Sequence, residues 1–298
     1  MTPQAGPHRR VTDELLRPGR GLVAHSPGCL AGGMSISSTA EKAELLRSLH
    51  VPGDPLIVTN VWDSITARVV AGAPGVKALA TASHSISEAH GVEDGEGLDV
   101  DEMLAAARLV IRSVDLPVSV DFEKAYATDA AGTLDNVFRL IEEGAAGLNI
   151  EDSIGQAKAP LYDVDTQVSK VAAARRAGDR AGVPIVINAR VDSLAGDPDS
   201  FDDAVTRANA YLDAGADCAF VLGLGTEDAV KRALDEIHGK ISVISGPTSV
   251  PLARLAELGV SRVSFGPMSM GLTLSHLRDA AARLTAREAY PEELGFSF

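Results

Sequence analysis

The feature that most constrains the fold of this chain is a regular alternation of short apolar runs with longer helical patterns. Between residues 55 and 266, eight runs of mostly β-branched and aliphatic residues are each followed by a segment with helical periodicity. The phrases EEGAAGLNI, DAGADCAFV and ELGVSRVSF repeat one helix–Gly–strand junction, in which Gly supplies the left-handed residue that ends a helix. Such serial βα units predict a parallel sheet. The candidate strands are 55–60, 76–82, 116–122, 145–151, 183–189, 217–222, 240–245 and 262–266.

Eight such units in 298 residues match a (β/α)8 TIM barrel, an α/β fold. The alternative is a doubly wound open sheet, which usually has fewer strands and a glycine-rich phosphate turn after the first one. Here the first run ends in TNVWDS, with neither a G-x-G-x-x-G nor a Walker sequence. We therefore expect the barrel to occupy residues 34–298, after a flexible N-terminal extension at 1–33 that is rich in Pro, Gly, Arg and His. The segment MSISSTAEKAELLRSLH after this extension predicts an amphipathic helix with a Ser or Thr cap.

The chain is acidic overall, which limits its partners. A formal net charge of −14 and a pI near 4.9 argue against nucleic acid and against an anionic membrane surface. No apolar run reaches the roughly 18 residues of a membrane span, and Cys29 and Cys218 do not suggest a disulfide framework. A cytoplasmic protein is expected, in which an anionic substrate needs a local metal ion or arginine to bind.

Acidic residues end two consecutive apolar runs. LPVSVDFE ends in Asp121 and Glu123, and AAGLNIEDS leads to Glu151 and Asp152. Asp121 and Glu123 are two residues apart, so a strand would place both on one face, pointing into the mouth of the barrel. Carboxylates gathered at this edge repel one another unless a cation neutralises them. Hard oxygen ligands of this kind predict Mg²⁺, with Mn²⁺ as an alternative. A single acid here would more simply be a helix cap or an ion pair.

Two further segments carry candidate groups. Arg190, in VINARVDSL, can grip a carboxylate or phosphonate in bidentate fashion, or form a structural salt bridge to Asp192 or Asp152. The second segment, SHSISEAHGVEDGEGLD, is predicted to be an unusually long loop, which suggests a function. Its two histidines, His84 and His90, are candidate acid–base groups or merely solvated side chains. No HxH or HExxH spacing supports zinc.

NVWDSITARVV, the D-G-E-G-L segment, VDFE, LNIEDS and NARVDSL together resemble the isocitrate lyase/phosphoenolpyruvate mutase superfamily, from about residue 34 to about residue 275. The resemblance implies a (β/α)8 barrel and Mg²⁺-dependent chemistry on 2-oxo acids or related carboxylates, in which C–C or C–P bonds are broken or formed. It also implies a homodimer or homotetramer in which neighbours exchange a C-terminal helix.

The same resemblance assigns roles to individual residues. It implies that Asp121 is the direct Mg²⁺ ligand, while Asp94, Glu123 and Glu151 hold the waters of the ion. It also implies that Arg190 binds the substrate anion. The substrate-binding candidates are Ala82, Ser83, His84, Asn188 and Arg190, and the catalytic candidates are Arg190, Glu123 and Lys124.

The chain departs from the family pattern on two loops. Lyases of the family carry K-K/R-C-G-H after the fourth strand, whereas EDSIGQAKAPLYD here has neither Cys nor His. The Lys and Asn of the mutases correspond to Ala157 and Ala159, with Lys158 one place off. The family's G-Y-G after the metal-binding strand is replaced by A-Y-A at 125–127. It is preceded by Lys124, which is either a catalytic or anion-binding group or a partner for Glu96 or Asp129.

Three functions are consistent with these features. The first is a Mg²⁺-dependent enzyme that cleaves a C–C bond of a small 2-oxo or 2-hydroxy mono- or dicarboxylate through an enolate, by lyase, hydrolase or decarboxylase chemistry. The second is a C–P mutase or hydrolase acting on a phosphonate such as phosphonopyruvate. The third is a barrel that binds metal and carboxylate without catalysis.

Overall fold

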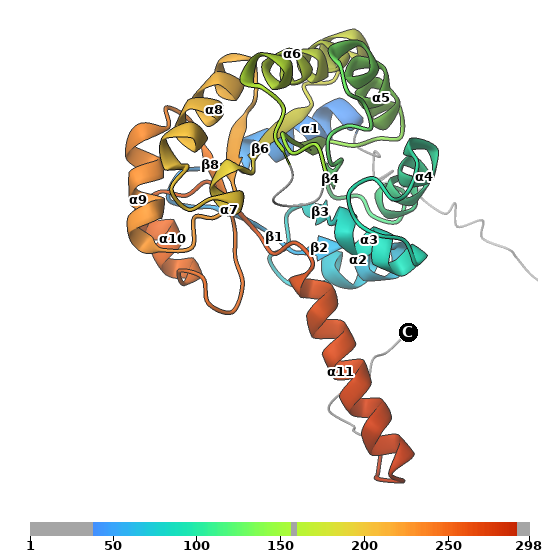
Figure 1. Cartoon of the computed structure of the whole chain (residues 1–298). Helices are drawn as coiled ribbons and strands as arrows, with labels where there is room; N and C mark the ends of the chain where they lie inside the picture. Colours follow the sequence, from blue (N-terminus) through green and yellow to red (C-terminus); the bar gives the residue numbers. More distant parts are fainter. Residues whose placement is uncertain (1–37, 156–159, 291–298) are drawn as a thin grey trace, which may run out of the picture. The chain divides into compact units, whose positions relative to one another are not determined.

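The apolar runs form a ring of parallel strands in the computed structural model, which describes residues 38–155 and 160–290 (Figure 1). The hydrogen-bonded order is β1-β9-β8-β7-β6-β5-β4-β3-β2, and every neighbouring pair is parallel. The strands are β1 (Leu56–Val58), β2 (Asn60–Val61), β3 (Leu79–Thr81), β4 (Val118–Asp121), β5 (Gly147–Glu151), β6 (Val186–Val191), β7 (Cys218–Val221), β8 (Ile241–Ile244) and β9 (Arg262–Ser264).

The predicted α/β barrel is confirmed, with one difference in strand count. The first predicted strand, 55–60, divides at Thr59 into β1 and β2. β1 pairs with β9 and β2 pairs with β3, so this one segment joins the two ends of the sheet into a nearly closed ring. Eight predicted strands thus appear as nine.

Helices cover the outside of the ring, and most of the predicted ones are present. Ser38 caps α1 with a reciprocal bond to Glu41, as the Ser/Thr-rich start of that segment predicts. The helices are α1 (Thr39–Ser48), α2 (Ser64–Ala71), α3 (Ser83–His90), α4 (Val100–Ile111), α5 (Ala130–Glu142), α6 (Val164–Ala181), α7 (Ser193–Gly196), α8 (Phe201–Asp213), α9 (Glu227–Glu236), α10 (Leu252–Leu258) and α11 (Met268–Thr285).

The segment 83–99 was predicted as a long loop, and that prediction is wrong for its first half. Residues Ser83–His90 form α3, which ends at Gly91 with a φ of +74°. The serine-rich sequence SHSISEAH has a single large apolar residue, Ile86, and this residue is buried. One apolar position is too few to reveal a helical period, so the pattern could not show this helix.

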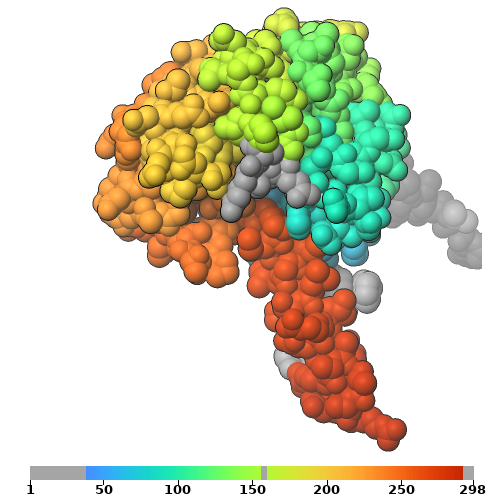
Figure 2. Space-filling view, in the orientation of Figure 1, coloured from blue at the N-terminus to red at the C-terminus, as the bar shows by residue number. Residues whose placement is uncertain are grey.

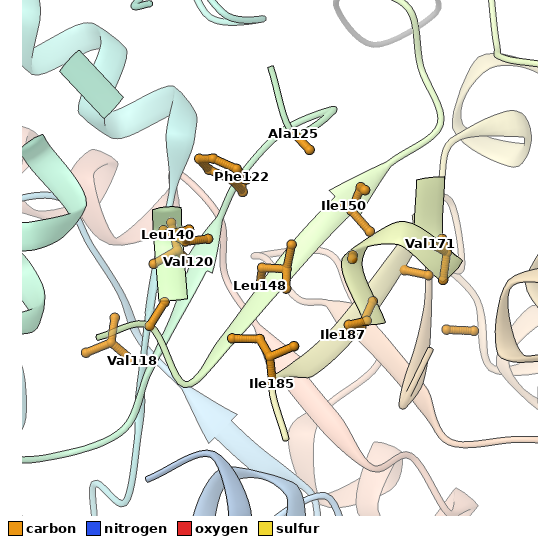
Figure 3. Close-up of a cluster of buried hydrophobic side chains, with 14 of the residues drawn as sticks. Val118, Val120, Phe122, Ala125, Leu140, Leu148, Ile150, Val171, Ile185 and Ile187 are labelled. Atoms are coloured by element: carbon orange, nitrogen blue, oxygen red, sulfur yellow. The ribbon is translucent and has the colours of Figure 1, made fainter. Parts of the chain in front are cut away.

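Alternate residues of the strands face two different environments. Val118, Val120 and Phe122 pack outward against Leu140 of α5, in the apolar cluster shown in Figure 3. The intervening Ser119 and the equivalent residues of neighbouring strands face the barrel interior and are largely polar. This alternation buries the apolar face under the helices and leaves the inner face available for a site.

α1 closes the barrel at the amino ends of the strands. Its Ala43 and Leu46 form a small buried cluster with Leu56, Val58 and the first residues of other strands. His50 follows this helix, is 2% exposed, and donates a hydrogen bond from Nδ1 to the Leu46 carbonyl, 2.8 Å away. Burial, with further contributions from nearby cations, lowers the pKa of His50 to about 3.

This histidine is expected to make stability depend on pH. Between pH 6.5 and about 3 the unfolded chain binds a proton at His50 that the native chain does not, so the free energy of unfolding falls as pH falls through this window. The contribution is fully present above pH 6.5. Its loss should approach roughly 1.4 kcal/mol per pH unit inside the window. Urea unfolding at pH 7.0, 6.0 and 5.0 should show a shallower slope for His50→Gln than for the parent protein.

The matched control is His90→Gln, which changes an exposed histidine at the end of α3 whose Nδ1 also bonds to a backbone carbonyl four residues earlier. This variant should keep the parent slope. Equal slopes for His50→Gln and the parent protein would show that His50 takes up protons equally in both states, and the buried neutral assignment would then be wrong.

Candidate active site

A cavity of about 200 Å³ lies at the carboxyl ends of the strands. This is the edge at which TIM-barrel enzymes place their active sites. Six of the residues selected from the sequence line it: Ala82, Ser83, His84, Asp94, Asp121 and Arg190. Four others, Glu123, Lys124, Glu151 and Asn188, are described by the structure but are not part of its lining. The sequence therefore identified the location and about half of its polar surface.

Asp121, the last residue of β4, lines this cavity and is held by four hydrogen bonds. Its Oδ2 accepts hydrogen bonds from the backbone N–H and the hydroxyl of Ser83, at 3.0 and 2.8 Å. Its Oδ1 accepts one from Asn149 Nδ2 at 3.2 Å, and its own N–H donates to Thr81 Oγ1 at 2.8 Å. Ser83 at the start of α3 and Asn149 of β5 thus fix the orientation of this carboxylate, as a ligand-binding group requires.

Asn188 contacts Asp121 indirectly, through Asn149. It is fully buried, and its Nδ2 donates to Asn149 Oδ1 at 2.8 Å, so it orients the amide that contacts Asp121. Its role in substrate binding stays a prediction. Asn149 itself was not selected from the sequence. The sequence feature that could have identified it is its place in LNIE, two residues before Glu151. This spacing puts both side chains on one face of β5.

Glu123 lies in the turn after β4 and is not part of the cavity lining. β4 ends at Asp121, and Glu123 has a φ of +46°, a left-handed conformation that interrupts the alternation of the strand. Glu123 is 2% exposed and accepts a hydrogen bond from the Tyr126 hydroxyl at 2.9 Å. Glu123 therefore lies beyond the end of β4, although its carbonyl still accepts the N–H of Glu151 at 2.9 Å, and its predicted role around the ion stays a prediction.

Lys124, in the same turn, is paired with an acid. Its Nζ lies 2.9 Å from Glu96 Oε2, and both side chains are mostly buried. Glu96 was one of the two structural partners that the sequence allowed. The Lys124 carbonyl accepts a hydrogen bond from the buried Lys170 ammonium at 2.9 Å, and burial lowers the pKa of Lys170 to about 8. A catalytic role for Lys124 stays a prediction.

Arg190 reaches the cavity from β6 while it pairs with two carboxylates. Its NH1 lies 2.5 Å from Glu151 Oε2, and its Nε and NH2 donate to the two oxygens of Asp192 at 2.7 and 2.9 Å. The salt bridge to Asp192 was the structural alternative proposed for Arg190. Burial raises the pKa of Glu151, and the Arg190 charge acts in the opposite direction. The guanidinium is thus fixed in place by its acidic partners, and Arg190 is one of the residues that line the cavity.

A buried network behind Arg190 explains the second acid of LNIEDS. Asp152 is fully buried, and its Oδ1 accepts the backbone N–H of Asp192 at 3.0 Å. Its Oδ2 accepts the Tyr211 hydroxyl at 2.8 Å and Arg207 NH1 at 3.3 Å, both from α8. Burial raises the pKa of Asp152 to about 6. Asp152 therefore anchors the segment that orients Arg190, and does not itself face the cavity.

The acids of the site fit a hard divalent cation. Within residues 38–155 and 160–290 no three His, Cys, Asp or Glu side chains are arranged as ligands of one ion. Asp121 and Asp94 nevertheless bring two carboxylates to the cavity. The pKa of Glu123 is raised to about 7, chiefly by burial; the Tyr126 hydrogen bond lowers it, and the charges of Asp121, Asp94 and Glu96 act in the same direction as burial. Mg²⁺ keeps several waters and needs only one or two protein carboxylates, so Asp121 and Asp94 suit it.

The two histidines predicted as acid–base candidates lie in different surroundings. His84 Nδ1 lies 3.5 Å from Asp94 Oδ2 at the cavity, with its side chain 44% exposed. His90 bonds to the Ile86 carbonyl and does not line the cavity.

Ala157, Lys158 and Ala159 lie outside the described residues, as does the extension at 1–33. In the part of the chain that is described, no helix is both long and apolar enough to cross a membrane.

Comparisons with known proteins agree with this geometry. Residues 46–285 match the family model of phosphoenolpyruvate phosphomutase. A crystal structure of a candidate phosphonomutase from Burkholderia cenocepacia J2315 is 38% identical with a TM-score of 0.77, covering 82% of this chain and 99% of that chain. An oxaloacetate decarboxylase of Rhodopseudomonas palustris (strain TIE-1) is 29% identical over 254 residues, 75% of this chain and 80% of the relative.

The phosphoenolpyruvate phosphomutase of Streptomyces hygroscopicus is 27% identical over 256 residues, which are 79% of this chain and 77% of the relative. The family match spans the whole strand ring, from before β1 to the end of α11. The resemblance seen in the motifs is thereby confirmed. The chain belongs to the phosphoenolpyruvate phosphomutase family, within the phosphoenolpyruvate mutase/isocitrate lyase superfamily.

Proposed function

We propose that this protein is a Mg²⁺-dependent enzyme that cleaves a C–C bond of a small 2-oxo or 2-hydroxy carboxylate through an enolate. The observation that carries the proposal is one small cavity in which two carboxylates, Asp121 and Asp94, face a helix N-terminus and the Arg190 guanidinium. Acids that can hold a cation and groups that can hold an anion lie side by side. A metal-chelating carboxylic acid matches this combination of charges.

Different residues of the site would bind the metal ion and the substrate. Asp121 and Asp94 would hold the ion, with Glu123 and Glu151 behind them. The bound ion would polarise the 2-oxo or 2-hydroxy group and stabilise the negative charge left when the neighbouring bond breaks. The substrate carboxylate would bind at the N-terminus of α3, where backbone N–H groups and the helix dipole favour an anion. Arg190, fixed by its two acidic partners, would add a directed positive charge.

The relatives support C–C chemistry and also keep a C–P reaction as the second candidate. One relative is named an oxaloacetate decarboxylase, which is a C–C activity. Another is named a phosphoenolpyruvate phosphomutase, and the crystal structure that is 38% identical is described as a candidate phosphonomutase. The two named activities act on different kinds of bond, so direct assay must separate them.

The test is turnover of a panel of 2-oxo and 2-hydroxy acids, followed by proton NMR with Mg²⁺ and with EDTA. Phosphonopyruvate belongs in the same panel and is followed by phosphorus NMR. Cleavage of a carbon substrate that requires Mg²⁺ supports the proposal. A phosphorus signal that changes only with enzyme and Mg²⁺ supports the C–P reaction instead. Oxalate binding without any turnover would favour a non-catalytic barrel.

We further propose that a second copy of the chain covers α11, in a homodimer or homotetramer. α11 extends from the barrel near β2, and Met270 is its single buried residue among those described (Figures 1 and 2). Leu272, Leu274 and Leu277 are 67%, 54% and 64% exposed. A row of exposed leucines on one helix is typical of a surface that is buried in an assembly.

Leu272→Asp combined with Leu277→Asp is therefore expected to convert the oligomer to a monomer, because two carboxylates cannot be buried in an apolar contact. Sedimentation velocity at matched concentrations measures this change. Leu109→Asp, at a leucine of α4 that is 63% exposed, is the control and should leave the mass unchanged. An unaltered mass for the double variant would remove α11 from the interface.

A further inference from the structure

The cavity has two chemically distinct sides. The side formed by β3 to β6 carries the acids, Ser83 and Arg190. The side formed by β7, β8 and the start of α11 carries Phe220, Leu222, Ile244 and Pro267, which we call the apolar wall. The proposed metal ion and substrate carboxylate both bind at the first of these two sides.

The apolar wall has no counter-charge of its own. The polar residues that line the cavity beside it are Asn60 and Ser264, and both are uncharged. The Asn60 amide is already used: its Nδ2 donates to the Thr81 carbonyl at 2.8 Å, and its Oδ1 accepts the N–H groups of Phe265 and Gly266 at 2.8 and 2.9 Å. The Asn60 amide is therefore a poor hydrogen-bond donor for a second anionic group of the substrate.

The basic side chains among the described lining residues belong to the polar side. They are His84 and Arg190. His84 lies beside Asp94, and Arg190 is shared between Glu151 and Asp192. A second carboxylate directed at the apolar wall would lose its hydration without gaining a cation. Such desolvation is unfavourable, whereas a hydrocarbon group there gains by the hydrophobic effect.

We infer that the substrate carries an apolar group, such as a branched alkyl chain, on the carbon that departs as an aldehyde or ketone, where a dicarboxylate would carry its second anion. In that step the breaking C–C bond gives its electrons to the enolate, and the departing carbon, which bears a hydroxyl, becomes a carbonyl as the hydroxyl proton is released. This inference rests on the proposed function and narrows its substrate class. The carboxylate and the 2-oxo or 2-hydroxy group bind at the polar side. The apolar group lies against Phe220, Leu222 and Ile244. A cavity of about 200 Å³ limits this group to a few carbon atoms, since drug-sized ligands occupy roughly 300–1,000 Å³.

Two stable acids of nearly equal shape test this inference. Malate and 2-hydroxy-4-methylpentanoate share the 2-hydroxy acid head, and they differ by a carboxylate in place of an isopropyl group. Calorimetric titration of the protein with each acid, in the presence of Mg²⁺, should show the alkyl acid binding roughly tenfold tighter or more. Equal affinities, or tighter binding of malate, would overturn the inference.

Oxalate, titrated separately with Mg²⁺, reports on the head-group site alone. If oxalate binds and neither hydroxy acid does, the inference fails while the proposed function stands. If oxalate also fails to bind, the proposed function fails and the inference fails with it.

A cation placed on the apolar wall should reverse the preference. Leu222 is half-buried, so Leu222→Arg can direct its guanidinium into the cavity. Malate is then expected to bind at least roughly tenfold better relative to the alkyl acid than it does to the parent protein. Leu109→Arg makes the same change on the outer surface of α4 and should leave the ratio unaltered.

A milder variant covers the case in which Leu222→Arg does not fold. Leu222→Ala removes part of the apolar wall without adding charge. It should weaken binding of the alkyl acid several-fold and leave malate unaffected. An equal effect on both acids would show that Leu222 does not distinguish them, and the inference would be withdrawn.

Discussion

Asp121→Asn is expected to abolish Mg²⁺-dependent binding of oxalate and, with it, turnover. Asp121 lines the cavity and is held by Ser83 of α3 and Asn149 of β5. The amide keeps the shape of the side chain but removes the negative charge that attracts the ion. Changes to outer partners of metal sites cost roughly 10–100-fold in affinity, so loss of a direct ligand should cost more. Calorimetry with Mg²⁺ and oxalate measures the effect.

Asp163→Asn is the matched control for this variant. Asp163 is an exposed N-cap of α6, and its Oδ1 accepts the N–H of Thr166 at 2.9 Å. Asparagine caps helices about as well as aspartate, so this variant should keep both binding and turnover. Retention of Mg²⁺-dependent turnover by Asp121→Asn would refute the placement of the ion at Asp121.

Arg190→Met is expected to lower the free energy of unfolding by about 3–5 kcal/mol, because it leaves buried carboxylates without a counter-charge. Glu151 is 5% exposed and Asp192 is 2% exposed, and both lie against the guanidinium. Urea unfolding without ligand measures the loss independently of substrate binding. The double variant Arg190→Met with Asp192→Asn should recover part of it, since one of the stranded charges is then gone.

Arg232→Met serves as the comparison. Arg232 also contacts two acids, Asp202 and Glu236, but on the exposed surface of α9. Exposed pairs of this kind contribute little, so its unfolding midpoint should not change measurably. If Arg190→Met were as stable as Arg232→Met, the buried triad of Glu151, Arg190 and Asp192 would not be a stabilising unit.

Much of the barrel could be predicted because its signals are local. A buried strand flanked by Gly-terminated helices is visible in any short window of the chain, and such units determine a parallel sheet. The acid at the end of such a strand must lie at the carboxyl edge, which is why Asp121 was located correctly at the cavity. α3 escaped prediction because SHSISEAH buries only one large apolar side chain, Ile86, and therefore shows no period.

The direction of individual side chains could not be predicted in the same way. Glu123 lies just beyond β4, in a turn at 122–126 that takes left-handed conformations at Glu123, Ala125 and Tyr126. This turn is stabilised from elsewhere in the chain: Asn136 donates to the carbonyls of Ala125 and Tyr126, at 3.1 and 3.0 Å. No local pattern announces a left-handed alanine, since its conformation depends on such distant contacts.

The sequence by itself determined that the chain alternates strands with helices and ends its third and fourth predicted strands in acids. These properties depend on the order of residues within one element, and the hydrophobic periodicity of the sequence shows that order directly. Only the tertiary structure decided that Arg190 also pairs with Glu151, and that Phe220, Leu222 and Ile244 line the same cavity as the acids. Those side chains belong to different strands, and closure of the ring brings them together. Spacing along the chain carries no information about that distance.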